Sequence, residues 1–332
     1  MKKNDLQNKK ILITGAAGFI GSHLTERLVQ LGASVKAFVH YNSFSDVGHL
    51  KETFSSRHNQ LEIVYGDIRE LDSVRHAVKG SDLVFHLASI ISVPYSTMHP
   101  QEVFTTNVTG TLNVLLACQD SSVQKLLQTS SSEVYGSALY TPIDEKHPRQ
   151  SQSVYAASKV SADALCYSFY RSYNLPVAIC RPFNTYGPRQ SGRAVIPTII
   201  SQALRKKEIN LGTLTTRRDF TYVTDTVEGL IEVCLSNKTV GHEVNLGVGY
   251  DISIEELVNL ISDLLGTKLK IKTEKKRLRP PTSEVSQLLS NNALVKNFTD
   301  WLPKVSFKHG LQNTIAWIEK NISSYDLHEY RL

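Results

Sequence analysis

The sequence contains few cysteines and no long hydrophobic run. Its four cysteines lie in separate apolar stretches without a Cys-x-x-Cys spacing, which argues against a disulfide framework and a zinc site. No apolar run approaches the roughly 20 residues that cross a bilayer, and the chain begins with the polar, basic segment MKKNDLQNKK. We therefore expect no signal peptide, no membrane partner and no metal, and a reducing cytoplasm as the location.

Positive charge is concentrated late in the chain. The formal net charge is +6, and much of the excess lies in KLKIKTEKKRLRPP at residues 268–281. Such a stretch is most simply a solvated strand and loop, and it could also attract a phosphorylated small substrate. No zinc finger, RNP-like aromatic pattern or recognition-helix motif accompanies it, so we expect no nucleic-acid partner.

Short apolar segments alternate with amphipathic segments through the first half of the sequence. This alternation predicts a parallel sheet covered by helices on both faces, because parallel strands need long crossover connections. We therefore predict an α/β fold with a doubly wound, Rossmann-type domain over residues 1–185. The expected strands are 11–14, 34–39, 61–65, 83–86, 125–129 and 177–180, and the expected helices are 19–31, 71–79, 103–118 and 155–173.

A cluster of proline and glycine interrupts this pattern after Arg181. At roughly 150 residues per domain, the remaining length is enough for a second folded unit. We interpret residues 186–332 mainly as a smaller, interleaved C-terminal α/β lobe that binds substrate, with some segments returning to the first domain. Its expected helices are 195–206, 224–236, 254–265 and 310–321.

Three glycines, Gly15, Gly18 and Gly21, follow the first expected strand and open the first expected helix. Glycine permits a tight turn and close backbone approach, and a helix N-terminus offers unpaired N–H groups to a pyrophosphate. We predict that these glycines, with Phe19 and Ile20, bind a dinucleotide. A purely structural turn is the alternative.

The acidic residue that usually reads the adenosine ribose, about 20 residues after the glycines, is missing. The second expected strand instead runs into His40 and Asn42, with no acid or arginine directly after it. The missing carboxylate removes the usual basis for selecting an unphosphorylated ribose, and the missing arginine leaves the 2′-phosphate of NADP without an obvious partner. NAD is the expected cofactor, and NADP is not excluded. Asp67 and Ile68, after the third expected strand, are further candidates for contacts with the adenosine, although Asp67 could equally cap a helix.

Tyr155 and Lys159 lie four residues apart at the start of a long amphipathic segment. Positions i and i+4 share a helix face, so the lysine ammonium can lie near the phenol. A nearby cation, helped by a bound nicotinamide, can lower the phenol pKa from about 10 toward neutrality. Tyr155 could then take a proton from a sugar hydroxyl while hydride leaves the same carbon. The spacing is common by chance, and the glycine turn makes it significant. We predict that both residues are catalytic and contact the cofactor.

Ser131, Ser132 and Glu133 follow the fifth expected strand. Ligands bind at the carboxyl ends of strands in open parallel sheets. A hydroxyl there can bond the reacting oxygen, and a carboxylate adds a general base and acid that plain oxidoreduction or 4-epimerisation does not need. We predict that all three are catalytic. For Glu133, a surface-paired glutamate is the alternative.

Together these motifs resemble those of the extended short-chain dehydrogenases/reductases, in the NAD-dependent epimerase/dehydratase group that acts on nucleotide sugars. The resemblance implies cofactor contacts from Leu87, Ala88 and Asn107, and a homodimer formed through helices around 108–118 and 155–173. It spans about residues 10–317 and includes HLAS (86–89), NVTGT (107–111), SSSEVYG (130–136), YAASK (155–159), RPFNTYGPRQ (181–190), RRDFTYVTD (217–225) and RLRPPTSEV (277–285).

The resemblance also implies how the nucleotide sugar is bound. Asn184, Arg218 and Arg279 match residues at or near the substrate diphosphate, for which a guanidinium fork is well suited. Val195 matches the border of the nucleobase site. Asn184 and Arg218 could instead simply order loops.

Within this group, nucleotide-sugar 4,6-dehydratases carry an acidic residue where Glu133 stands. The YNSF run and the RPFNTYGPRQSGRAVIPTII stretch most resemble the legionaminic-acid-pathway type, with Ser131 in place of the usual threonine. This resemblance implies that UDP- or GDP-linked N-acetylglucosamine is dehydrated to a 4-keto-6-deoxy sugar by hydride transfer from C4 to C6. Some UDP-glucuronate decarboxylases share SEVYG, so a decarboxylase or 4-epimerase is an alternative. The non-enzyme alternative is a dinucleotide-sensing protein.

Overall fold

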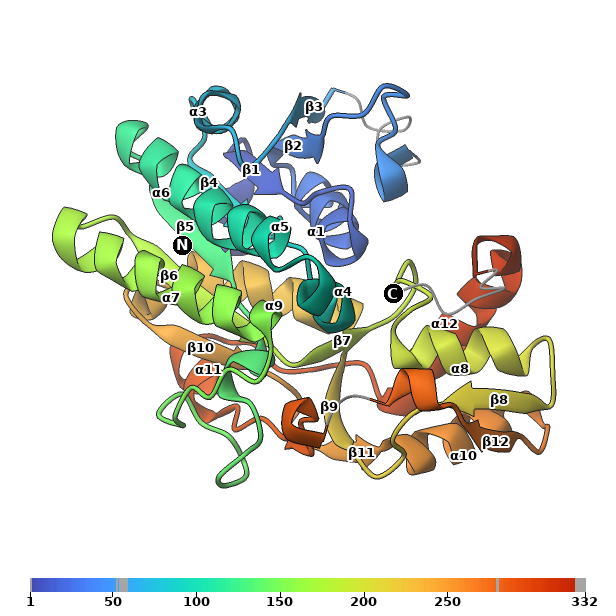
Figure 1. The fold of residues 1–332 in the computed structure, drawn as a ribbon. Helices are drawn as coiled ribbons and strands as arrows, with labels where there is room; N and C mark the ends of the chain where they lie inside the picture. The colour runs from blue at the N-terminus through green and yellow to red at the C-terminus, as the bar shows by residue number, and fades with distance from the viewer. Residues whose placement is uncertain (1, 52, 54–58, 279–280, 326–332) are drawn as a thin grey trace.

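The structure is a computed structural model that describes residues 2–51, 53, 59–278 and 281–325 (Figure 1). Its centre is a parallel sheet of seven strands in the order β10-β6-β5-β4-β1-β2-β3. The chain winds outward from β1 in both directions, so the predicted doubly wound, Rossmann-type α/β fold is confirmed. The strands are β1 (Lys10–Thr14), β2 (Ser34–His40), β3 (Leu61–Gly66), β4 (Leu83–His86), β5 (Lys125–Thr129), β6 (Val177–Pro182) and β10 (Glu243–Leu246).

Helices cover both faces of this sheet. In β1, Ile11 and Ile13 pack into one hydrophobic cluster and Leu12 into the opposite one, and all three are fully buried. Burying each such side chain contributes about 1.5–3 kcal/mol, which explains why the strand is apolar on both faces. One face carries α1 (Phe19–Gln30), α9 (Val223–Leu235) and α11 (Ala293–Phe298), and the other carries α3 (Leu71–Val78), α6 (Gly110–Asp120) and α7 (Val154–Tyr173).

The second lobe is built around β9 (Arg217–Tyr222). This strand pairs with three short strands, and a separate two-stranded sheet lies in the same lobe. Three helices pack with these strands around one hydrophobic cluster. The strands are β7 (Asn184–Tyr186), β8 (Glu208–Leu211), β11 (Asp251–Ser253), β12 (Lys270–Thr273) and β13 (Gln287–Leu288), and the helices are α8 (Val195–Ala203), α10 (Ile254–Leu265) and α12 (Phe307–Lys320).

The chain crosses between the two sheet systems more than once (Figure 1). After β9 it passes through α9, which packs on the large sheet, into β10. Strand β10 pairs with β6 as the seventh strand of the large sheet, and the chain then returns to the second lobe at β11. Residues far apart in the sequence therefore share one layer.

Helix boundaries before α6 differ from the prediction for residues 103–118. The structure has α4 (Val93–Met98) and α5 (Pro100–Phe104), and a π-helical turn at Thr105–Thr109 joins α5 to α6. A proline suits the first turn of a helix, where no N–H is needed, which explains the start at Pro100. Within the described ranges, no helix is long and apolar enough to cross a membrane.

Candidate active site

The glycine turn connects β1 to α1 and lies against the end of β4. Gly15 has a φ of 71°, and a Cβ at this position would lie 2.7 Å from the backbone nitrogen of Ala88. A Cβ at Gly21 would overlap the carbonyl oxygen of Gly15. Because α1 begins directly after Gly18, the turn presents unpaired N–H groups of the first helical residues, Phe19 and Ile20 among them. This cradle fits the pyrophosphate of a dinucleotide.

A buried hydrogen-bond network fixes the end of β4 beside this turn. Thr14 Oγ1 accepts hydrogen bonds from the backbone N–H groups of Leu87 (3.2 Å) and Ala88 (3.1 Å). It also lies 2.7 Å from His86 Nδ1, and His86 Nε2 lies 3.0 Å from Thr111 Oγ1. Burial lowers the pKa of His86 to about 3, so the ring is neutral. The sequence analysis named Leu87 and Ala88 but missed the supporting side chains, although HLAS and NVTGT contain two of them.

The end of β2 is the expected border of an adenosine site. His40 is exposed there. Asn42 uses its amide within its own loop: Oδ1 accepts hydrogen bonds from the backbone N–H groups of Phe44 (3.2 Å) and Asp46 (2.9 Å). These bonds order the loop, and contacts of His40 and Asn42 with a cofactor stay predictions.

Asp67 lies directly after β3, next to the end of β2. It forms an ion pair with Arg69 at 2.5 Å, and hydrogen bonds from Arg69 hold the pKa of Asp67 below its usual range. Asp67 does not cap α3, because Glu70 holds the N-cap position. The neighbouring Ile68 carbonyl accepts a hydrogen bond of 3.0 Å from Asn113. Asp67 and Ile68 are therefore fixed in position at the predicted edge.

Asn107 lies in the π-helical turn and is buried. Its Oδ1 accepts a hydrogen bond from the Ile90 N–H (2.8 Å), and its Nδ2 donates to the Ile90 carbonyl (3.0 Å) and to Ser158 Oγ (2.9 Å). Ser158 Oγ in turn donates to the carbonyl of Tyr155 (2.7 Å). Asn107 therefore ties the loop after β4 to the helix that carries Tyr155. A direct contact with a cofactor stays a prediction.

Tyr155 and Lys159 are both buried on α7, one helical turn apart. Burial raises the pKa of the Tyr155 phenol, and a hydrogen bond with the Ser131 side chain opposes this rise. Lys159 Nζ donates to the Thr129 carbonyl (3.0 Å), and burial lowers the pKa of Lys159 to about 8. Burial and the negative charges of Glu133 and Asp163 together raise the phenol pKa, and its lowering beside a lysine and a bound nicotinamide stays a prediction. A buried phenol loses its proton only where a positive charge stabilises the phenolate.

The serine–glutamate turn, residues 130–136, follows β5. Ser131 Oγ caps its short 3₁₀ helix by accepting a hydrogen bond of 3.2 Å from the Glu133 N–H, and Ser132 is buried. No described residue hydrogen-bonds or ion-pairs with the Glu133 carboxylate. Besides burial, the negative charge of Glu133 raises the pKa of Tyr155. The turn thus brings a hydroxyl and a carboxylate to the phenol at the carboxyl end of the sheet.

A buried ion pair lies behind this turn and was missed by the sequence analysis. Asp163, one helical turn beyond Lys159, pairs with Arg181 of β6 at 2.9 Å, and both side chains are fully buried. The available signal was an acid on the buried face of a helix and an arginine at the end of an apolar strand.

Three of the residues predicted to bind the nucleotide sugar lie in or near the second lobe. Asn184 begins β7, and its Oδ1 is buried without a hydrogen-bond partner among the described residues. Arg218 of β9 lies 3.8 Å from Glu284 in an ion pair, and Val195 is the first residue of α8. Arg279 lies outside the described residues. Substrate contacts of all four stay predictions.

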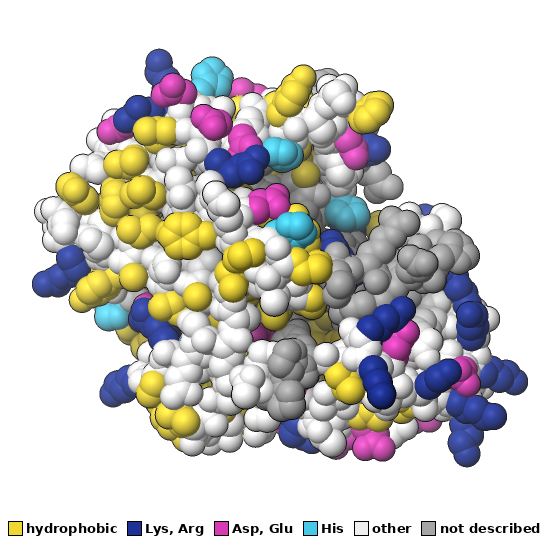
Figure 2. All heavy atoms as spheres, in the orientation of Figure 1, with side chains coloured by type: hydrophobic (Ala, Val, Ile, Leu, Met, Phe, Trp, Pro, Cys, Tyr) yellow, Lys and Arg dark blue, Asp and Glu magenta, His cyan; other side chains and the backbone are white. Residues whose placement is uncertain are grey.

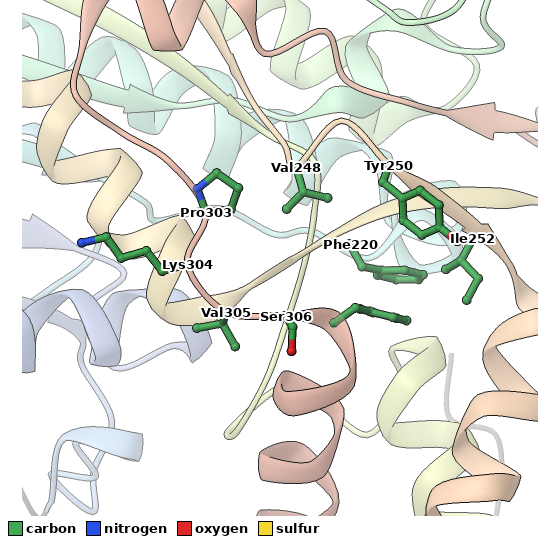
Figure 3. A pocket seen from close by; sticks show the side chains of 9 residues that line it. Phe220, Val248, Tyr250, Ile252, Pro303, Lys304, Val305 and Ser306 are labelled. Carbon is green, nitrogen blue, oxygen red and sulfur yellow. The ribbon is translucent and has the colours of Figure 1, made fainter.

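A separate pocket of about 330 Å³ lies in the second lobe between β9, β11 and the start of α12 (Figure 3). Its lining is mainly apolar, and the rings of Phe220 and Phe307 stack with centroids 5.8 Å apart. None of the predicted site residues lines it. In the part of the chain that the structure describes, no group of three or more His, Cys, Asp or Glu side chains could hold a metal ion.

Comparisons with known proteins agree with this arrangement. The model of the family described as GDP-mannose 4,6 dehydratase matches residues 12–314. A human dTDP-D-glucose 4,6-dehydratase is 31% identical over 96% of this chain and 92% of its own length. UDP-glucuronic acid decarboxylase 1 of Xenopus tropicalis is 32% identical over 98% of this chain and 76% of its own length.

A solved structure adds a third reaction of the same kind of enzyme. UDP-glucuronic acid 4-epimerase from Bacillus cereus, in complex with UDP-glucuronic acid and NAD, has a TM-score of 0.86 and 27% identity, covering 94% of this chain and 99% of that one. Dehydratases, decarboxylases and epimerases therefore share this architecture. The chain belongs to the GDP-mannose 4,6-dehydratase family of extended short-chain dehydrogenases/reductases, within the NAD-dependent epimerase/dehydratase group.

Proposed function

We propose that the protein is a nucleotide-hexose 4,6-dehydratase that acts on UDP- or GDP-linked N-acetylglucosamine with NAD as its cofactor. The observation that carries this proposal is the position of Glu133. Its negative charge raises the pKa of the Tyr155 phenol, and it lies on the same turn as Ser131, which hydrogen-bonds that phenol. A 4-epimerase needs no carboxylate at this place, whereas a dehydratase needs a base for the proton on C5.

The residues around the glycine turn suit NAD. Gly15, Gly18 and Gly21 with the start of α1 would hold the pyrophosphate, and the strand ends at His40 and Asp67 would border the adenosine. Phe19, Ile20, Asn42, Ile68, Leu87, Ala88 and Asn107 complete the proposed cofactor contacts, and Tyr155 and Lys159 would face the nicotinamide ribose. When bound, NAD supplies a hydride acceptor at C4 of the sugar and returns the hydride at C6.

The first task of the protein side chains is to deprotonate the C4 hydroxyl. Tyr155 takes this proton, and the Ser131 hydroxyl hydrogen-bonds to the C4 oxygen while the ketone forms. Lys159 provides the positive charge that a buried phenolate requires. Since burial sets the Lys159 pKa at about 8, the ammonium form dominates at neutral pH.

The second task is the loss of water from C5 and C6. The C4 ketone acidifies the proton on C5, and Glu133 removes it. The C6 hydroxyl leaves as water after receiving a proton from Glu133, directly or through Ser132. Tyr155 then gives C5 the proton that it took from the C4 hydroxyl, so Tyr155 and Glu133 both end each cycle in their starting states.

Substrate binding would use the second lobe. Arg218 and Arg279 would hold the diphosphate, because a guanidinium offers paired donors to phosphate oxygens. The unpartnered Asn184 Oδ1 would accept a hydrogen bond near the diphosphate. Val195, at the start of α8, would border the nucleobase.

The decisive experiment compares wild type with Glu133→Gln on a panel of UDP-, GDP-, dTDP- and CDP-hexoses, read by product mass. Wild type should give a product lighter by one water, and Glu133→Gln should lose most of this product while still reducing bound NAD. Glu255→Gln, an exposed change on α10, is the matched control and should act as wild type. Full turnover by Glu133→Gln would contradict the assignment.

Other outcomes of the same experiment identify the alternatives. Loss of carbon dioxide from a UDP-glucuronate substrate would make the protein a decarboxylase, and an isomer of unchanged mass would make it a 4-epimerase. Tight NAD binding with no product from any sugar nucleotide would favour a dinucleotide-sensing protein.

We also propose that the chain pairs with a second copy through α5, α6 and α7. Figure 2 shows hydrophobic side chains gathered over this side of the molecule. Phe104 of α5 and Tyr167 of α7 are each 52% exposed, and large apolar side chains gathered in one patch are typical of an interaction surface. Light scattering should give twice the mass of the chain, and Tyr167→Glu should reduce that mass to one chain.

A further inference from the structure

The serine–glutamate turn is held at both of its ends by one buried ion pair. At the start of the turn, Ser130 Oγ donates a hydrogen bond of 2.8 Å to Asp163 Oδ2. At its end, Arg181 Nη1 donates a hydrogen bond of 2.9 Å to the Tyr135 hydroxyl, and the guanidinium lies 5.1 Å from the centre of the Tyr135 ring. Arg181 also donates to Asp163 Oδ2 from Nη2 at 2.9 Å and from Nε at 3.2 Å. Every one of these side chains is buried.

This ion pair is itself anchored to the edge strand of the large sheet. Arg181 Nη2 lies 2.8 Å from Glu243 Oε2 on β10, and the Tyr135 hydroxyl donates a hydrogen bond of 2.7 Å to Asn245 Oδ1 on the same strand. Groups from α7, β6 and β10 therefore converge on the turn. Both charges of the ion pair are fully buried, so displacing the turn from them would leave buried polar groups without their partners, which is costly.

Asp163 also acts on the helix side of the site. It lies one helical turn beyond Lys159, and although burial lowers the Lys159 pKa, the Asp163 carboxylate opposes that fall. The same carboxylate thus fixes the start of the turn and stabilises the charge of the lysine.

We propose that Asp163 and Arg181 are positioning residues that hold Ser131 and Glu133 in register with Tyr155 and Lys159. The inference deepens the proposed function and rests on it for the role of Glu133. It does not make either residue catalytic, because neither side chain reaches the surface of the site. A carboxylate that must meet one carbon atom needs such a support, since a displacement of 1 Å costs about 100-fold in rate.

The first test needs no substrate. The double variant Ser130→Ala, Tyr135→Phe removes both hydroxyls that connect the ion pair to the turn and leaves the charges in place. Hydrogen exchange of the free protein should become faster at the amides of residues 131–136 and stay unchanged in α12. Thr314→Val, which also loses one buried hydroxyl, should leave the turn unaffected. Unchanged exchange at the turn in the double variant would overturn the proposal.

The second test measures the two chemical stages. In the double variant, formation of dehydrated product should fall about 10- to 100-fold with KM unchanged, because this stage needs Glu133 in place. Formation of reduced cofactor, which uses Ser131 but not Glu133, should fall less. Arg181→Lys keeps the positive charge but loses the several N–H donors of the guanidinium. It should likewise slow formation of dehydrated product more than formation of reduced cofactor. An equal fall in both stages would show a merely structural role and overturn the inference.

The two proposals can fail separately. Absence of a dehydrated product from wild type would contradict the proposed function alone, because hydrogen exchange would still report on the turn. Normal dehydration by the double variant would contradict the positioning role alone.

Discussion

Lys159 offers a sharp test of how burial and function oppose each other in this site. Its ammonium is buried and donates one hydrogen bond, to the Thr129 carbonyl. A pKa of about 8 in place of 10.5 means that keeping the lysine charged in the fold costs about 3 kcal/mol. Lys159→Met removes this charge and keeps a similar side-chain volume.

The expected gain in the free energy of unfolding is smaller than the full cost of keeping the buried lysine charged. The Thr129 carbonyl loses its donor, which costs about 1–2 kcal/mol. We therefore expect Lys159→Met to raise the free energy of unfolding by about 1–2 kcal/mol at neutral pH and Tm by about 2–3 °C. The same variant should lose nearly all turnover, because Tyr155 would lack the positive charge that stabilises its phenolate.

The stability difference between Lys159→Met and wild type should change with pH in a definite direction. Between pH 8 and 10.5 the unfolded lysine holds a proton that the folded lysine lacks, so the stability of wild type rises with pH in this window. Lys159→Met has no such group, and its advantage should be complete below pH 8 and shrink toward 10.5. Scanning calorimetry of both proteins across this window measures the difference.

Lys125 is the matched control, because burial also lowers its pKa to about 8. Its ammonium has three acceptors, the carbonyls of Val233 and Ser236 and the hydroxyl of Thr239. Lys125→Met should therefore destabilise the fold while sparing the chemistry. If Lys159→Met is less stable than wild type at neutral pH, or if its advantage does not change with pH, the argument from burial is refuted.

Three further changes test the cofactor side of the site. Gly21→Ala should weaken NAD binding at least about tenfold by fluorescence titration, because its Cβ would overlap the Gly15 carbonyl oxygen; Gly80→Asn, in open space, should bind normally. Thr14→Val should lower the free energy of unfolding by about 2–3 kcal/mol in denaturant titrations, since the Ala88 N–H and His86 Nδ1 lose their buried partner, whereas the Leu87 N–H keeps the Thr14 carbonyl. A loss under about 0.5 kcal/mol would argue against the network. Asp67→Asn should lower the free energy of unfolding by less than about 1 kcal/mol at neutral pH. At acid pH it should cost nothing, because the ion pair is lost as pH falls through the Asp67 pKa, which lies below its usual range. An equal cost at both pH values would contradict this reading.

The sequence was sufficient for the features that arise from local patterns. The strand KILIT, the glycines after it and the amphipathic segment that follows predict a strand, a tight turn and a helix N-terminus, and the structure has these elements at Lys10–Thr14 and Phe19–Gln30. Tyr155 and Lys159 fall on one helix face because their spacing alone determines it.

The features that were missed depend on contacts between distant segments. Strand β10 has only four residues and pairs with β6 about 60 residues earlier, and no local pattern gives that register. The π-helical turn around Asn107 depends on bonds to Ile90 and Ser158 from two other elements. The phenol pKa of Tyr155 also depends on packing, because burial is the largest cause of its rise and no local pattern gives that burial.

The crossings of the chain at α9 and β10 set how the protein can be divided. A fragment ending at residue 185 would lack the strand that covers the edge of β6 and the helix that covers one side of the sheet. Such a fragment would offer a bare strand edge and apolar surface, and it should aggregate when expressed by itself. Both lobes should therefore melt in a single cooperative step, and attempts to exchange the second lobe between relatives would need to carry α9 and β10 along.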